Sequence, residues 1–82
     1  MKPSTLDAIN RYVDLHCPTG DFLYAVLTNN LKESFAQADD ENGRDLKEIV
    51  NYCYWEIPSK CWGSVEKVEK WLEGRKKDVS VV

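Results

Sequence analysis

A broad apolar stripe at helical spacing is the feature that most constrains this chain. Its members recur at i, i+3, i+4, i+7, i+8 and i+11, and they are Leu46, Ile49, Val50, Cys53, Tyr54 and Ile57. This spacing places all six on one face of an α-helix, which must pack against a hydrophobic core. Pro58 follows directly and cannot continue the helix. The pattern therefore predicts a helix that buries this stripe and ends at Pro58.

A longer helical pattern begins at residue 21. Its apolar members recur at i, i+4, i+8, i+12 and i+15, and they are Leu23, Leu27, Leu31, Phe35 and Ala38. Asn29-Asn30 interrupts this pattern, and Asn30 followed by Glu33 has the spacing of a new N-cap. The sequence leaves open whether the segment is one long helix or two short helices joined at Asn29.

The two ends of the chain add one helix each. The first is predicted over about 5–16, with Ser4 and Asp7 as a capping box. The last begins after Ser64, and Gly74 has the position of a glycine that ends a helix. We therefore expect an all-α fold, a small single-domain bundle of four or five short helices.

The composition fits one globular domain. The chain has 82 residues, of which 43% are hydrophobic and 30% are charged. The expected domain spans residues 1–74, and residues 75–82 form a loose basic and apolar tail. No apolar run is long enough to span a membrane, and no secretion signal is recognisable. Three cysteines form no disulfide framework, which favours a reducing compartment such as the cytoplasm.

The charge is unevenly distributed. Residues 1–59 hold five basic and ten acidic side chains, whereas residues 60–82 hold six basic and four acidic side chains. A protein that contacts nucleic-acid phosphates needs a concentrated basic face. The acidic body of this chain argues against direct nucleic-acid binding.

Three stretches carry a family resemblance. They cover nearly the whole chain, and they are residues 22–33, Ala38-Asp39 followed by Asn42, and the block from Ile49 to Trp71 with Tyr52, Tyr54, Glu56, Pro58 and Cys61-Trp62-Gly63-Ser64. They resemble a family of small, mostly uncharacterised bacteriophage and prophage proteins. The sequence departs from that family at Trp55, where members often have Asn. The departure leaves in doubt whether the surface before Ile57 is shared with the family.

The resemblance implies a phage protein in the host cytoplasm. Accessory phage proteins of this kind commonly inhibit or redirect a host component, including host defence systems. This implication is an analogy between families and does not follow from the chemistry of any residue.

Metal binding and catalysis find little support in the residues. Zinc ligands normally pair two to four residues apart, and His16, Cys17, Cys53 and Cys61 do not follow that spacing. The acidic run before Gly43 lacks the first and last ligands of an EF-hand loop. His16 is the only histidine, and no catalytic signature surrounds a cysteine. We expect no metal, no cofactor and no enzymatic activity.

A surface that binds a host protein is the leading functional prediction. Tyr and Trp are common anchors of protein interfaces, and acidic surfaces can occupy basic channels of a partner. The candidate contact residues are Asp39, Asp40, Glu41, Trp55 and Trp62. The alternative is that the acidic residues only cap a helix and that the aromatic rings only pack against the core.

Two alternatives belong to other functional classes. In the first, the protein is a homo-oligomer that sequesters a nucleotide or another small signalling ligand. The candidate ligand-binding residues are then Lys67, Lys70, Arg75, Lys76 and Lys77, and a ring such as that of Trp62 stacks on the base. These charges are otherwise the solvated face of the last helix. In the second alternative, the protein is a structural or assembly component of the phage particle.

Overall fold

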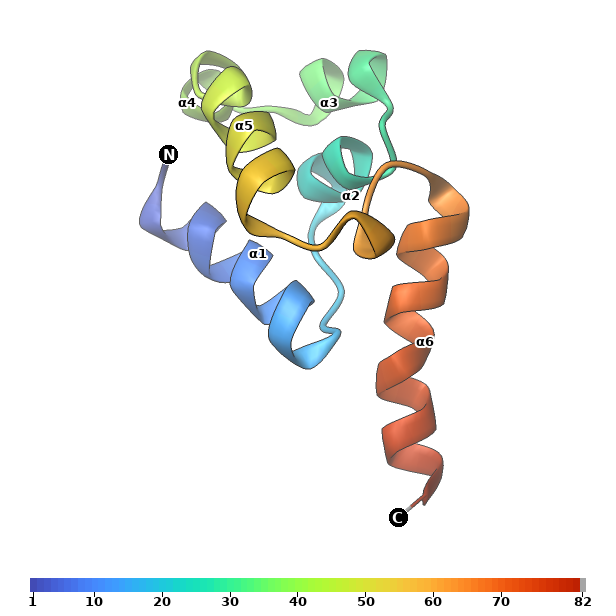
Figure 1. The fold of residues 1–82 in the computed structure, drawn as a ribbon. Coiled ribbons are helices and arrows are strands. Elements are labelled where there is room, and N and C mark those ends of the chain that lie inside the picture. Colours follow the sequence, from blue (N-terminus) through green and yellow to red (C-terminus); the bar gives the residue numbers. More distant parts are fainter. Residues whose placement is uncertain (82) are drawn as a thin grey trace.

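The computed structural model describes the backbone of residues 1–81 and the side chains of residues 1–74. Six α-helices and one 3-10 helix follow one another in this part of the chain (Figure 1). They are α1 (Pro3–Leu15), α2 (Asp21–Leu27), α3 (Leu31–Gln37), α4 (Asp40–Arg44), α5 (Leu46–Glu56), η1 (Ser59–Cys61) and α6 (Val65–Val81). Residues 1–81 contain no strand, so the predicted all-α fold is confirmed.

One hydrophobic core joins four of the α-helices and η1. Its largest fully buried side chains are Tyr12, Ile9, Leu27, Ile49, Val68, Cys53 and Cys61. The hydroxyl of Tyr12 crosses this core and donates to the backbone oxygen of Cys61, 49 residues later. The core therefore holds α1, α2, α5, η1 and the first half of α6 together.

Only part of the predicted stripe on α5 is buried. Leu46, Ile49, Cys53 and Ile57 lie in the core as expected. Val50 and Tyr54, also expected in the core, are 39% and 66% exposed. Successive helical residues turn by about 100°, so these two side chains share one edge of the stripe. The core covers the rest of the stripe and leaves that edge in solvent.

The Asn29-Asn30 interruption divides the second helical pattern into two helices. Asn29 has a φ of 64°, in the left-handed region that Asn tolerates better than most residues. The side chain of Asn30 then caps α3 by accepting a hydrogen bond from the backbone nitrogen of Glu33 at 3.1 Å. The change of direction takes Leu31 and Phe35 out of the core, where the pattern had placed them.

The acidic run forms a short helix of its own. Asp39 caps α4 by accepting from the backbone nitrogen of Asn42 at 2.7 Å, and the carboxylates of Asp40 and Glu41 occupy the first turn. Negative charge is favourable there because the unpaired amide groups carry partial positive charge. This separate turn explains why the structure has more helices than the predicted four or five.

Both terminal helices differ from their predicted bounds. The first helix begins at Pro3, with Lys2 at the N-cap and no side-chain cap from Ser4. Proline favours this position because its φ is already helical and its missing N–H is not needed there. The last helix does not end at Gly74 but continues to Val81, so residues 75–81 are helical rather than a loose tail. The C-terminal part of α6 projects beyond the other helices (Figure 1).

None of the helices in the described residues is long and apolar enough to cross a membrane.

Candidate protein-binding groove

An apolar groove of about 450 Å³ opens on the surface between α3 and α5. Its lining residues are Leu31, Phe35, Gly43, Arg44, Leu46, Lys47, Val50 and Asn51. We call it the α3/α5 groove. Leu31 is 66% exposed and Phe35 is 57% exposed. Large apolar side chains are usually buried, so both are more exposed than expected.

The local structure of α3 explains this exposure. Ser34 is the one buried side chain of α3, and its hydroxyl donates to the backbone oxygen of Asn30 at 2.7 Å. Ser34 therefore faces the interior, whereas Leu31 and Phe35 face solvent. The result is a helix that packs through a serine and exposes its two large apolar residues.

An aromatic pair continues the apolar surface along α5. Tyr54 lies one helical turn after Val50, so it extends the same edge of the helix. Its ring meets the ring of Trp55 edge to face, with centroids 4.9 Å apart and an interplanar angle of 79°. Trp55, predicted as a contact residue, is 74% exposed. The groove and this pair form one apolar strip on α3 and α5.

The distribution of exposed apolar side chains singles out this strip. Among the residues with described side chains, seven large apolar ones are exposed, and five of them lie on α3 and α5. The other two are Leu15 and Val65, which lie on different helices. Single exposed apolar residues are common, but a contiguous group rimmed by polar residues is typical of an interaction site.

The charged residues of the groove are both basic. Arg44 and Lys47 line it, and no acidic residue does so. Within the part of the chain that has described side chains, neither forms an ion pair with a carboxylate. The groove therefore presents apolar contacts beside two positive charges, although the chain as a whole carries a net charge of −3.

The predicted acidic contact residues have mixed roles. Asp39 caps α4 and also forms an ion pair with Lys2. The backbone amide of Asn42 and the Lys2 ammonium both lower the pKa of Asp39 below its usual value. Asp40 and Glu41 are exposed, and Glu41 lies 3.9 Å from the Lys2 ammonium. Two of the three carboxylates are thus available at the surface, and Asp39 has a structural role.

The acidic residues and Trp55 are not brought together. The acidic residues precede the first turn of α5, and Trp55 lies in its last turn, about 14 Å further along the helix axis at 1.5 Å per residue. Trp62 is half-buried and packs against the core, as the packing alternative expected. The five predicted contact residues therefore do not form one site.

Two of the five predicted basic residues lie together. Lys67 and Lys70 line a hollow next to Trp71, whereas Trp62, the predicted stacking ring, does not line it. The other three predicted ligand-binding residues are Arg75, Lys76 and Lys77, and their side chains lie outside the described residues.

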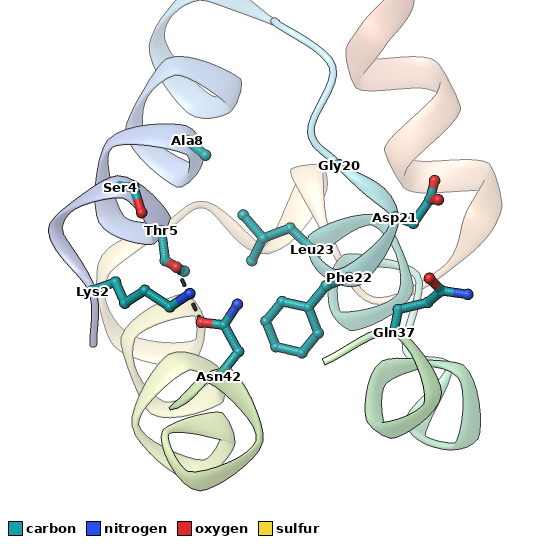
Figure 2. A pocket seen from close by; sticks show the side chains of 10 residues that line it. All are labelled: Lys2, Ser4, Thr5, Ala8, Gly20, Asp21, Phe22, Leu23, Gln37 and Asn42. Atoms are coloured by element: carbon teal, nitrogen blue, oxygen red, sulfur yellow. Dashed lines mark hydrogen bonds between the residues drawn. The ribbon is translucent and has the colours of Figure 1, made fainter. Parts of the chain in front are cut away.

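A third hollow, of about 320 Å³, is lined mainly by residues of α1 and α2 (Figure 2). Figure 2 shows Thr5 and Asn42 pointing toward each other, and the Thr5 hydroxyl donates to Asn42 Oδ1 at 3.2 Å. Lys2 also lines this hollow, and its ammonium is paired with Asp39. These polar groups satisfy one another and attach α4 to α1, so we regard the hollow as structural.

The buried cysteines are poorly suited to nucleophilic chemistry. Burial, with a smaller contribution from nearby Cys61, raises the pKa of Cys53 to about 12. Burial also raises the pKa of Cys61. A thiol must lose its proton to act as a nucleophile or as a metal ligand. Within residues 1–74, no three His, Cys, Asp or Glu side chains are grouped to hold a metal ion.

Comparisons with known proteins assign neither a family nor a function to this chain. No family model, no curated protein and no solved structure matches the chain. Periodicity places the groove residues Leu31, Phe35 and Val50, and Tyr54 beside them, in the core, which is why sequence reasoning missed their exposure. For Leu31 and Phe35, the one signal in the sequence was the Asn29-Asn30 interruption, because a break there changes the face that α3 presents.

Proposed function

We propose that this protein works by binding another protein in the α3/α5 groove. The observation that supports the proposal is the exposure of Leu31, Phe35 and Val50 around one hollow that is also lined by Arg44 and Lys47. Aromatic and aliphatic side chains set in a concave surface are typical anchors of protein interfaces. In this proposal the protein is not an enzyme.

The charges of the groove indicate the chemistry of the partner. Apolar side chains of the partner fill the hollow, and its carboxylates meet Arg44 and Lys47. Complementary charge of this kind increases specificity and association rate more than affinity. The partner segment is therefore an amphipathic one whose apolar residues are flanked by acidic residues.

The biological role follows from the family resemblance. We propose a bacteriophage accessory protein in the host cytoplasm that inhibits or redirects a host protein, with counter-defence as the leading case. The exposed carboxylates of Asp40 and Glu41 would provide a second, separate contact. An interface that covers the groove would remove apolar surface from water and so stabilise the complex.

Affinity capture from a bacterial host lysate tests this function. The wild type is compared with a groove variant, Phe35→Ser with Val50→Ser, and with a matched control, Leu15→Ser with Val65→Ser. Each variant replaces two exposed apolar side chains, and circular dichroism confirms folding. We expect a host protein that the wild type and the control retain and the groove variant loses. Purified partner is then assayed with increasing amounts of the wild type, and its activity should fall.

Two results would refute the proposal. One is a set of captured proteins that is the same for the groove variant and the control. The other is that the wild type captures no host protein and forms a dimer that the groove substitutions disrupt. The groove would then be a self-association surface. Light scattering of all three proteins distinguishes that result.

A further inference from the structure

A separate hollow of about 500 Å³ lies at the start of α6 and shares no lining residue with the α3/α5 groove. It is lined by Lys60, Ser64, Glu66, Lys67, Lys70 and Trp71. Its volume is in the range of small-molecule sites, about 300–1,000 Å³. The lining combines three lysines with one tryptophan.

The positive charge of this hollow is not neutralised by the fold. Glu66 is the only acidic residue among its described lining residues. None of the three lysines forms an ion pair with any carboxylate whose position is described. Three ammonium groups around one hollow attract an anion, and the surplus over the single carboxylate matches a dianion.

The ring is already held in position, and two of the lysines contact neighbouring groups. The indole nitrogen of Trp71 donates to the backbone oxygen of Tyr12 at 2.9 Å, and the ring stacks against His16 with centroids 4.3 Å apart. The Lys60 ammonium lies 5.5 Å from the centroid of the Trp71 ring. The Lys67 ammonium donates to the backbone oxygen of Ser59 at 3.3 Å. Such preorganisation lowers the entropy cost of binding a ligand.

We propose that this hollow binds a small organic phosphate in which a phosphate group is attached to a planar ring, as in a nucleoside monophosphate. Lys60, Lys67 and Lys70 contact the phosphate, because ammonium groups form strong charge-assisted hydrogen bonds with its oxygens. The Trp71 indole contacts the ring. The sequence prediction of a ligand site did not include Lys60, and it named Trp62 rather than Trp71 as the ring that contacts the base.

A titration followed by ¹H–¹⁵N NMR tests the site with adenosine monophosphate as the probe. We compare the wild type with Lys67→Gln plus Lys70→Gln, and with a control, Arg11→Gln plus Lys32→Gln, that loses the same charge at exposed positions outside both the hollow and the α3/α5 groove. We expect saturable shifts of the Trp71 indole signal and of amides in residues 60–71. The wild type and the control should bind equally, and the Lys67 and Lys70 variant at least about tenfold more weakly, a loss that corresponds to about 1.4 kcal/mol.

Two further probes separate the parts of the ligand. Adenosine lacks the phosphate and inorganic phosphate lacks the ring, so each should bind at least about tenfold more weakly than adenosine monophosphate. The proposal fails if no saturable shift occurs at about 10 mM adenosine monophosphate. It also fails if the hollow variant binds as well as the control, or if inorganic phosphate binds as tightly as the nucleotide. None of these outcomes depends on the α3/α5 groove.

Discussion

The imidazole of His16 occupies the space where a side chain at Gly74 would begin. A Cβ atom at position 74 would lie 2.8 Å from Nδ1 of His16 and 3.0 Å from Cε1. The same Nδ1 lies 2.7 Å from the backbone oxygen of Trp71, within hydrogen-bond distance. Gly74 therefore does not end α6; it lets the residue that follows α1 pack directly on the α6 backbone.

Gly74→Ala is expected to destabilise the fold by about 1–3 kcal/mol, because the new methyl group would overpack against the ring of His16. Alanine's better helix propensity opposes this effect by up to about 1 kcal/mol and does not cancel it. Urea unfolding measures the difference. In a His16→Gly background the ring is gone, and the cost of Gly74→Ala should largely disappear.

Gly43→Ala is the matched control for that substitution. Position 43 lies in α4, and the nearest atom to an added Cβ is the Cβ of Ala38 at 3.9 Å, an ordinary contact distance. Alanine should be neutral there or stabilising by up to about 1 kcal/mol. The close packing of His16 on Gly74 would be contradicted if both alanine variants changed stability in the same direction.

Ile49 and Val50 are neighbours on α5 with different burial, and their alanine variants should differ accordingly. Ile49 is fully buried, so Ile49→Ala should cost about 2–5 kcal/mol through lost burial and a residual cavity. Val50 is on the exposed edge, so Val50→Ala should cost less than about 1 kcal/mol. Denaturant unfolding of both variants checks this. Equal losses would show that Val50 is a core residue and that the groove is closed in solution.

Tyr12→Phe should cost about 1–3 kcal/mol, although it removes a single oxygen atom. The Tyr12 hydroxyl is the buried donor to the backbone oxygen of Cys61, and its removal leaves that acceptor without this partner. Thermal or urea unfolding gives the loss. Tyr54→Phe is the matched control, because Tyr54 is exposed and no loss is expected there. An unchanged stability for Tyr12→Phe would contradict the role of this hydrogen bond.

Stability should fall at alkaline pH. The raised pKa of Cys53, about 12, means that the folded state keeps a proton that the unfolded state loses near pH 9. Stability is therefore full below about pH 9 and decreases by about 1.4 kcal/mol per pH unit and per such group as the pH rises toward the folded pKa. Burial raises the pKa of Tyr12 as well, which adds a further loss above about pH 10.

Cys53→Ala isolates the contribution of this thiol. Urea unfolding between about pH 8 and pH 11 should give a shallower decline for the variant than for the wild type. The expected difference in slope above about pH 9 is close to 1.4 kcal/mol per pH unit. Identical slopes would show that the Cys53 thiol does not titrate differently in the folded and unfolded states.

The sequence predicted the helical class, the end of α5 before Pro58 and the burial of Cys53, because each depends on local chemistry or on periodicity. It did not predict the exposure of Leu31, Phe35, Val50 and Tyr54. Periodicity identifies an apolar face, but only the packing of neighbouring helices determines how much of that face is covered. The left-handed turn at Asn29 redirects α3 and exposes Leu31 and Phe35, whereas Val50 and Tyr54 lie on the edge of α5 that the core leaves uncovered.

The position of Trp71 shows the same limit for the phosphate site. Trp71 is partly buried on α6 and packs against the core. The contact with Lys60 depends on the 3-10 helix η1, which places its lysine over the ring of Trp71 on α6. Likewise, the sequence suggested that Gly74 ends the last helix. The true reason for a glycine there is the contact with His16, which lies 58 residues earlier and leaves no signal in the local sequence.

Site-specific photo-crosslinking in host cells tests the α3/α5 groove most directly. A benzophenone side chain is placed at Phe35 in the groove or at Leu15 on α1, both exposed positions. After irradiation, the groove position should yield an adduct with a host protein, and Leu15 should yield none. Adducts of equal amount from both positions, or an adduct from Leu15 alone, would contradict the groove as the partner-binding surface.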